Sequence, residues 1–282
     1  MKVKKPQTGT KRQIREEKKR ERRVALEITV AILVAAISIS SFFVNSVLNQ
    51  PSARQAVGTS GLKAAIIDQG SLSPASGPNP IFVENVTNTL KQAGYTVDYF
   101  PGEEVTVDFC RNLPKRGYDL IVFRVHSAVT QIRQSLAFFT SEKYDRTKYL
   151  GEQLTDRLVA VAYSQEDADK GTVYFGIPPT FVMQKMNGRF ENTTIIAMGC
   201  EGMTDSAMAE AFIEKGAKVY VGWNESVQAG HTDQATIFLL RSLITQNQTI
   251  EQAVENTTKE IGPDPASNAV LRCYLLDGVA GY

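Results

Sequence analysis

Two short apolar stretches decide the fold of this chain: Asp119-Leu120-Ile121-Val122-Phe123-Arg124-Val125 and Thr193-Thr194-Ile195-Ile196-Ala197-Met198-Gly199. Both are rich in β-branched residues, short enough for strands, and bounded by polar or glycine residues. Nearly continuous apolar strands are typical of a parallel sheet that is buried on both faces. The first stretch ends at His126-Ser127 and the second at Cys200-Glu201-Gly202. Functional groups of such sheets collect beyond the carboxyl ends of the strands, so we expect the functional site there.

Further apolar segments on either side of these stretches extend the pattern from residue 62 to residue 282. Strands are predicted at 63–68, 95–100, 217–222 and 269–276, and helices at 81–92, 107–116, 205–214, 232–246 and 250–261. Strands that alternate with helices predict right-handed βαβ units. The fold class is therefore α/β, a doubly wound, mostly parallel sheet with helices on both faces.

The middle of the domain is less regular. The segments 135–141 and 172–177 have the alternation expected of a small antiparallel hairpin, and a helix is predicted between them at 149–164. The helix at 205–214 begins near Thr204, which has the character of an N-cap.

The N-terminal part of the chain has a different composition. Residues 1–23 contain eleven Lys or Arg and three Glu, whereas the whole chain has a formal net charge of +1. An apolar, uncharged run follows within 24–48, and roughly 20 helical residues suffice to cross a bilayer. The excess of basic residues before the run predicts a cytoplasmic N-terminus. The basic tail is explained by this topology, so we expect no nucleic-acid partner.

We therefore predict four segments: a basic cytoplasmic tail (1–23), a transmembrane signal-anchor helix (24–48), a linker rich in small polar residues (49–61) and an external α/β domain (62–282). The alternative is a cleaved signal peptide, but no small-x-small cleavage motif follows the apolar run. An external domain also gives meaning to five glycosylation sequons, at Asn85, Asn192, Asn224, Asn247 and Asn256.

The three cysteines, Cys110, Cys200 and Cys273, are an odd number and leave at least one thiol without a partner cysteine. Their spacing is not that of metal ligands, and we expect neither a metal nor a cofactor. The chain also lacks the G-x-S-x-G, P-loop and G-x-G-x-x-G motifs, so serine-hydrolase, nucleotide-hydrolysing and dinucleotide-binding functions have no support.

The two strand ends suggest nucleophilic chemistry. Adjacent parallel strands lie about 4.8 Å apart, so His126 and Cys200 can meet if their strands are neighbours. A histidine can accept the thiol proton, and the thiolate is the reactive form. The backbone N–H groups of Ser127 and Cys200 are candidate oxyanion donors. The competing interpretation is structural, because a lone cysteine usually behaves as a small buried hydrophobic residue.

Three other residues are candidate substrate or ligand contacts. Asp68 ends the first strand, where it either contacts a ligand or forms a turn or helix cap. Glu201 either shifts the thiol pKa or caps the following helix. His231 opens a helix with Thr232 and Asp233, either of which has the character of a cap, and the alternative is a role beside the Cys200–His126 dyad.

The arrangement resembles the caspase-like fold of the clan CD cysteine peptidases, which include caspases, gingipains and CHAT domains. In that family His follows the third core strand and Cys the fourth, as His126 and Cys200 do here. The segment Gly216-Ala217-Lys218-Val219-Tyr220-Val221-Gly222 is similar to the strand after the family's Cys helix. Met198-Gly199-Cys200-Glu201-Gly202 matches the caspase Gln-Ala-Cys-x-Gly signature at the Cys and the following Gly. The family usually has Gly after the catalytic His, where this chain has Ser127.

The resemblance covers about residues 62–282 and implies a cysteine endopeptidase that acts on a peptide or protein substrate, with Cys200 as nucleophile and His126 as general base. Two alternatives remain open. The domain is either a catalytically inactive caspase-like interaction module, or a ligand-sensing doubly wound domain centred on Asp68.

Overall fold

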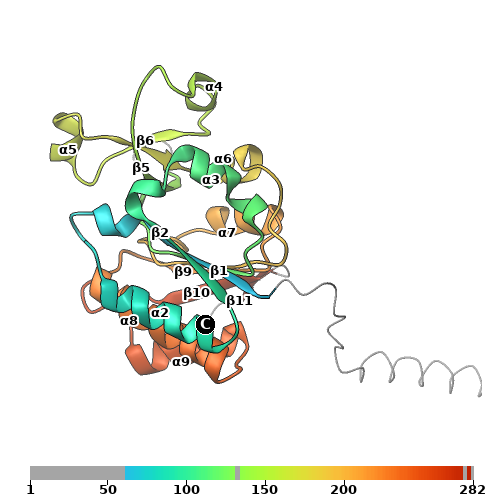
Figure 1. Cartoon of the computed structure of the whole chain (residues 1–282). Helices are drawn as coiled ribbons and strands as arrows, with labels where there is room; N and C mark the ends of the chain where they lie inside the picture. Colours follow the sequence, from blue (N-terminus) through green and yellow to red (C-terminus); the bar gives the residue numbers. More distant parts are fainter. Residues whose placement is uncertain (1–60, 131–133, 276–277, 281–282) are drawn as a thin grey trace, which may run out of the picture. The chain divides into compact units, whose positions relative to one another are not determined.

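The computed structural model describes residues 61–130, 134–275 and 278–280, which form a mixed α/β fold (Figure 1). Its main sheet has seven strands in the order β11-β10-β9-β8-β3-β1-β2. The neighbouring strands β2, β1, β3, β8 and β9 are parallel, and β10 pairs antiparallel with β9 on one side and with β11 on the other. Their bounds are β1 (Lys63–Asp68), β2 (Thr96–Pro101), β3 (Leu120–Phe123), β8 (Thr194–Ala197), β9 (Val219–Trp223), β10 (Leu271–Leu275) and β11 (Gly278–Ala280).

Helices cover both faces of this sheet, as Figure 1 shows. One face carries α3 (Val107–Asn112), α6 (Pro179–Lys185) and α7 (Ala207–Glu214), and the other carries α2 (Pro80–Gln92), α8 (Ala229–Leu240) and α9 (Ile250–Ile261). The sequence prediction of an α/β fold with a mostly parallel sheet between helices is therefore confirmed. The start of α9 shows why local sequence sufficed there. Thr249 and Gln252 form a reciprocal capping box that fixes its first turn.

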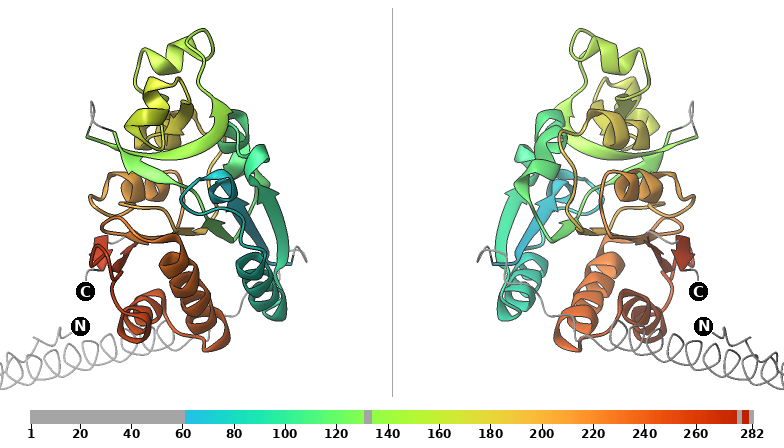
Figure 2. Two further views of the ribbon diagram at one scale, coloured as in Figure 1. Left: turned by 90° about the vertical axis from the view of Figure 1, so that its left-hand side faces the viewer. Right: turned by 90° about the vertical axis from the view of Figure 1, so that its right-hand side faces the viewer.

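A second, smaller sheet has four antiparallel strands in the order β4-β5-β7-β6 and lies beyond α3 and α6 (Figures 1 and 2). It consists of β4 (Ser127–Val129), β5 (Leu136–Lys143), β6 (Val159–Val161) and β7 (Tyr174–Ile177). The predicted antiparallel pairing of 135–141 with 172–177 is confirmed as β5 with β7.

The predicted helix at 149–164 is wrong. The structure has a single turn there, α4 (Leu150–Gln153), then β6, and then α5 (Gln165–Asp169). Tyr149 and Asp156 have φ values of 49° and 53°, which interrupt a right-handed helix. The β-branched residues Val159 and Val161 pair instead with β7. Tertiary pairing overrides the local helical pattern.

Two predicted helix starts also differ. The helix predicted from 205 begins at Ala207, and the Thr204 hydroxyl donates to the Asn224 carbonyl at 2.8 Å instead of capping it. The helix predicted from 232 begins at Ala229, so Thr232 and Asp233 lie inside it and are buried. Neither residue is a cap.

The predicted basic tail, signal-anchor helix and residues 49–60 of the linker lie outside the described residues. Among the residues that the structure describes, none of the helices combines the length and the apolar character that crossing a bilayer requires.

Aromatic side chains fill the core between the main sheet and α7. The Phe212 ring is fully buried and lies 5.7 Å, centroid to centroid, from each of Phe123, Phe190 and Tyr220. Phe123 ends β3, so this cluster holds α7 against the strand that leads to His126. The loop between β8 and α7 carries Cys200. The packing of Phe212 therefore helps to position both the end of β3, which leads to His126, and the helix that follows the Cys200 loop.

We expect Phe212→Ala to lower the free energy of unfolding by about 3–5 kcal/mol, because it removes buried aromatic area and leaves a cavity. Ile81→Ala is the matched control, since Ile81 is 69% exposed on α2, and it should change stability by about 0.5 kcal/mol or less. Urea unfolding of the full-length protein measures both. Equal effects of the two variants would contradict the assignment of Phe212 to the core.

Candidate functional site

The two strands that lead to His126 and Cys200 are direct neighbours. β3 pairs in parallel with β8, and Phe123 lies opposite Ala197. His126 is three residues beyond Phe123, and Cys200 is three residues beyond Ala197. The chain therefore brings the two residues to the same level at the carboxyl edge of the sheet.

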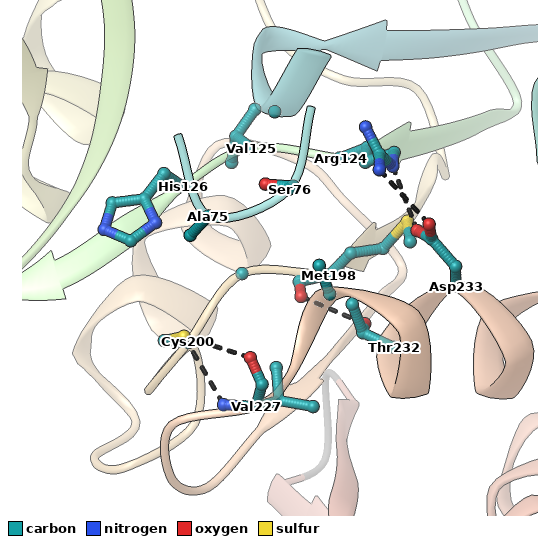
Figure 3. Close-up of a pocket in the computed structure, with 13 residues that line it drawn as sticks. Ala75, Ser76, Arg124, Val125, His126, Met198, Cys200, Val227, Thr232 and Asp233 are labelled. Carbon is teal, nitrogen blue, oxygen red and sulfur yellow. Dashed lines mark hydrogen bonds and ion pairs between the residues drawn. The ribbon is translucent and has the colours of Figure 1, made fainter. Parts of the chain in front are cut away.

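Both residues line one pocket of about 70 Å³, shown in Figure 3. Its walls come from the segment after β1, the ends of β3 and β8, and the region that leads into α8. The His126 ring and the Cys200 sulfur lie on the same side of this pocket in Figure 3. No hydrogen bond joins the two side chains within the described part of the chain.

The Cys200 thiol is held by the backbone of Val227. Its sulfur accepts a hydrogen bond from the Val227 N–H at 3.4 Å and donates to the Val227 carbonyl at 3.5 Å (Figure 3). Cys200 is half-buried, whereas Cys110 and Cys273 are buried, and the three form no disulfide. Cys200 is thus the most accessible of the three cysteines.

Two aromatic rings hold the His126 imidazole. Phe139 meets it edge to face at 4.6 Å between centroids, and Tyr163 lies at 5.1 Å. The backbone N–H of His126 donates to the side-chain oxygen of Gln69 at 2.9 Å. The side-chain NH₂ of Gln69 donates to the Tyr163 hydroxyl at 2.6 Å. The ring orientation is therefore set by packing on β5 and on the segment after β6.

Burial favours the neutral form of both members of the dyad. It raises the pKa of the Cys200 thiol above its ordinary value, an effect that the hydrogen bond from Val227 opposes and the Glu201 carboxylate reinforces. Burial also lowers the pKa of His126, against the opposing influence of Glu201. At neutral pH the pair is a thiol and a neutral imidazole and not a preformed ion pair.

Ser127 and Gly199 join the two strand ends. The Ser127 hydroxyl donates to the Cys200 carbonyl at 2.6 Å. A Cβ atom on Gly199 would lie 2.1 Å from the Ser127 Oγ and 2.7 Å from the Val125 carbonyl oxygen, so glycine is required at this position. The close approach of the strand ends depends on both residues.

The backbone N–H of Ser127, a predicted oxyanion donor, points away from β5. Thr130 donates to the Ser135 carbonyl, which makes 130–135 a hydrogen-bonded pair of the β4–β5 ladder. Pairs alternate along an antiparallel ladder, so Ser127 and Val129 occupy non-hydrogen-bonded positions. The Val129 N–H on this edge donates to the Glu201 carboxylate at 3.0 Å, and the Ser127 N–H faces the same side.

Glu201 does not cap the following helix. Its φ is 61°, its N–H donates to the Glu225 carbonyl at 3.0 Å, and its carboxylate is bound to Val129. The residue therefore lies between the cysteine loop and β4.

A buried ion cluster under the pocket was not predicted. Arg124 donates to Asp233 through Nε at 2.9 Å and through Nη2 at 3.1 Å, and to Asp68 through Nη1 at 2.8 Å. Burial disfavours the charge of Arg124, but these hydrogen bonds raise its pKa. Asp68 is 1% exposed and also accepts from the Tyr99 hydroxyl. The sequence did contain a signal for this cluster, because Arg124 is a charged residue within the apolar stretch 119–125, where it needs a buried partner.

His231 is not brought to the dyad. It does not line the pocket, and its Nε2 lies 3.2 Å from the Gly262 carbonyl oxygen, with the ring packed against Trp223. In the described residues no group of three or more His, Cys, Asp or Glu side chains is arranged to hold a metal ion.

We expect Gly199→Ala to destabilise the domain by about 1–3 kcal/mol, because the added methyl group overlaps the Ser127 hydroxyl and the β3 end. Gly151→Ala is the control, since a Cβ there meets nothing within 4 Å and Gly151 lies in α4. Urea unfolding should show no loss of stability for the control. A neutral Gly199→Ala variant would contradict the close packing of the two strand ends.

We expect Arg124→Met to lower the free energy of unfolding by about 3–5 kcal/mol at pH 7, because Asp68 and Asp233 lose their buried partner. Burial already raises the pKa of Asp68 in the folded protein. A raised folded-state pKa means that protonation favours the folded state, so the deficit should shrink as the pH falls from 7 to about 5.

The control for this pH dependence is Lys148→Met, which breaks the surface pair of Lys148 with Glu142. We expect it to cost about 1 kcal/mol or less, with little dependence on pH. Denaturant unfolding at several pH values compares the two variants, and a deficit for Arg124→Met that grows on acidification would contradict the buried carboxylate cluster.

No protein-family model and no curated protein sequence matches the chain. The function of this site is therefore inferred from its geometry.

Proposed function

We propose that this chain is a caspase-like cysteine peptidase, anchored in a membrane by residues 24–48 with the doubly wound domain of residues 62–282 on the outer side. Cys200 is the nucleophile and His126 the general base and acid. The observation that carries the proposal is the matched position of the two residues, three residues beyond paired positions of neighbouring strands and on the wall of one pocket. The half-buried Cys200 is supporting evidence, because the other two cysteines are buried.

In the proposed reaction the Cys200 sulfur attacks the carbonyl carbon of the scissile amide while its proton passes to His126. His126 delivers this proton to the amide nitrogen, the C–N bond breaks and the amine leaves. His126 then takes a proton from water as the hydroxide adds to the thioester carbonyl. The C–S bond breaks, the acid leaves, and His126 returns its proton to the Cys200 sulfur. Because both groups are neutral beforehand, proton transfer accompanies the attack.

The N–H groups of Ser127 and Cys200 are the proposed donors to the oxyanion. The Ser127 N–H lies on the edge of β4 that faces the cysteine loop, which supports this role. The thiol must also rotate away from Val227 before it can attack, since the hydrogen bonds to the Val227 backbone occupy it. In this proposal the arrangement with the thiol on Val227 is the resting state of the site.

A second candidate function is a catalytically inactive caspase-like module that binds a protein partner. The engagement of the thiol by Val227, together with its raised pKa, favours this candidate. The third hypothesis, a ligand site centred on Asp68, has less support, because Arg124, Tyr99 and the Ser71 N–H already occupy the Asp68 carboxylate.

A thiol-directed peptidyl acyloxymethyl ketone tests the peptidase. We expect it to label Cys200 in the full-length protein, at a rate that falls on acidification as His126 becomes protonated, with a midpoint below 6.5, the ordinary pKa of histidine. His126→Ala should slow the labelling roughly 100-fold, since it removes the general base. Mass spectrometry of the labelled peptides measures the rate and the site.

His231→Ala is the matched control, because it removes the other histidine of the chain, which lies outside the pocket. It should label at the wild-type rate. Labelling that is unchanged in His126→Ala would exclude the dyad mechanism. Iodoacetamide alkylation of Cys200 without any labelling by peptidyl ketones would favour the inactive module.

A further inference from the structure

A groove of about 680 Å³ lies beside the dyad, on the small sheet. Ligand sites of proteins commonly have volumes of about 300–1,000 Å³, whereas the pocket at Cys200 measures about 70 Å³. The groove is lined by both edge strands, β4 and β6, and by β5 and α5. Figure 1 shows this part of the domain, with α4, α5, β5 and β6. The groove has space for a segment of polypeptide, and the pocket does not.

The groove adjoins the surroundings of His126 and Cys200 through three of its lining residues. Phe139 and Tyr163 line it and at the same time pack against the His126 ring. Val129 lines it and its N–H binds the carboxylate of Glu201, the residue after Cys200. A chain in the groove would therefore lie next to residues that contact His126 and the Cys200 loop.

The lining is almost uncharged. Of the sixteen residues that line the groove, only Asp156 carries a formal charge, and most of the others are aliphatic or aromatic. Leu150 and Leu154, which are 55% and 83% exposed, belong to the same segment as the lining residue Gln153. Such a surface favours a bulky apolar side chain.

Several carboxylates lie at one side of the groove. The helix α5, which supplies Gln165 and Ala168 to the wall, also carries Glu166, Asp167 and Asp169. Among the described residues Glu166 forms an ion pair with Lys170, while Asp167 and Asp169 accept hydrogen bonds from Ser164 and Gln165. Together with the lining residue Asp156 these carboxylates form an acidic rim. An acidic peptide would be repelled from this rim, and a neutral or basic one would not.

The strand β6 indicates the conformation of the occupant. Successive residues 158–163 all line the groove, although side chains of a strand alternate between its two faces. The groove therefore reaches the edge of β6 as well as one face of the small sheet. Among the described residues, β6 pairs with β7 alone, so its other edge offers backbone groups to an extended peptide.

We propose that this groove binds an extended segment of a polypeptide along the edge of β6, with a bulky apolar side chain inside and no acidic residue beside it. If the bound segment is a substrate, the inference rests on the proposed peptidase, and the groove then selects the sequence a few residues from the scissile bond. Binding of the segment itself does not depend on the chemistry at Cys200.

Binding is therefore measured in the Cys200→Ala variant of the full-length protein, which cannot react. The probes are two fluorescein-labelled peptides, acetyl-Ala-Ala-Phe-Ala-Ala-Lys-amide and the same peptide with Asp in place of Phe, compared by fluorescence anisotropy. We expect the Phe peptide to bind at least tenfold more tightly. Equal affinities, or no binding of either peptide, would overturn the proposal.

Two substitutions place the binding in the groove. Ala160 on β6 and Ala168 on α5 are exposed residues that line the groove, so Ala160→Trp and Ala168→Trp fill it without entering the core. Each should weaken binding of the Phe peptide at least tenfold. Ala93→Trp, at an exposed position after α2, is the matched control and should bind as the parent does. Unchanged binding in both groove variants would overturn the proposal.

The outcomes separate this inference from the proposed function. Selective binding of the Phe peptide without labelling of Cys200 by peptidyl ketones would sustain the groove and refute the peptidase. Labelling of Cys200 that depends on His126, without selective binding, would sustain the peptidase and refute the groove.

Discussion

The parallel pairing of β3 with β8 is the constraint on which the site depends. β3 is paired on both sides, with β1 and with β8, and all three strands are buried. Parallel strands deliver their following residues to one edge, so Arg124, His126 and Cys200 come together although 74 residues separate the last two. The close approach of the two strand ends also requires Gly199, because a side chain there would overlap Ser127.

Burial has opposite consequences for the two polar groups at this edge. Arg124 keeps its charge, because a bidentate pair with Asp233 and a further hydrogen bond to Asp68 offset its loss of water, although burial still raises the pKa of Asp68. At Cys200 and His126 the opposing influences, the Val227 hydrogen bond and the Glu201 carboxylate, do not offset burial, which favours the neutral form of both side chains. The pocket thus has an ion pair on one wall and two side chains that favour their neutral forms on another.

Ser127 marks the departure from the caspase-like pattern, in which glycine usually follows the catalytic histidine. Its hydroxyl donates to the Cys200 carbonyl and so connects the Cys200 loop to β4. The Val129 N–H, which donates to the Glu201 carboxylate, makes a second connection. These two hydrogen bonds join the Cys200 loop to the small sheet that carries the groove.

The sequence by itself determined the elements whose local pattern agrees with their tertiary surroundings. The apolar, β-branched runs predicted β1, β3 and β8, and the capping box at Thr249 is a purely local device. The sequence predicted that His126 and Cys200 meet at one edge only on the condition that their strands are neighbours, and the pairing of β3 with β8 meets this condition. Only the tertiary structure decided the segment 149–164, because β6 exists through its pairing with β7.

The same holds for contacts between distant residues. Asp233 has the local character of a helix cap, but its partner is Arg124, 109 residues away. The thiol is held by Val227, 27 residues further along the chain. Hydrogen bonds and ion pairs of this kind depend on which elements pack together and on how much water they exclude. Local sequence therefore determined where the strands lie in the chain and that His126 and Cys200 follow strand ends. Packing between distant segments determined the hydrogen-bond and ion-pair partner of each polar group.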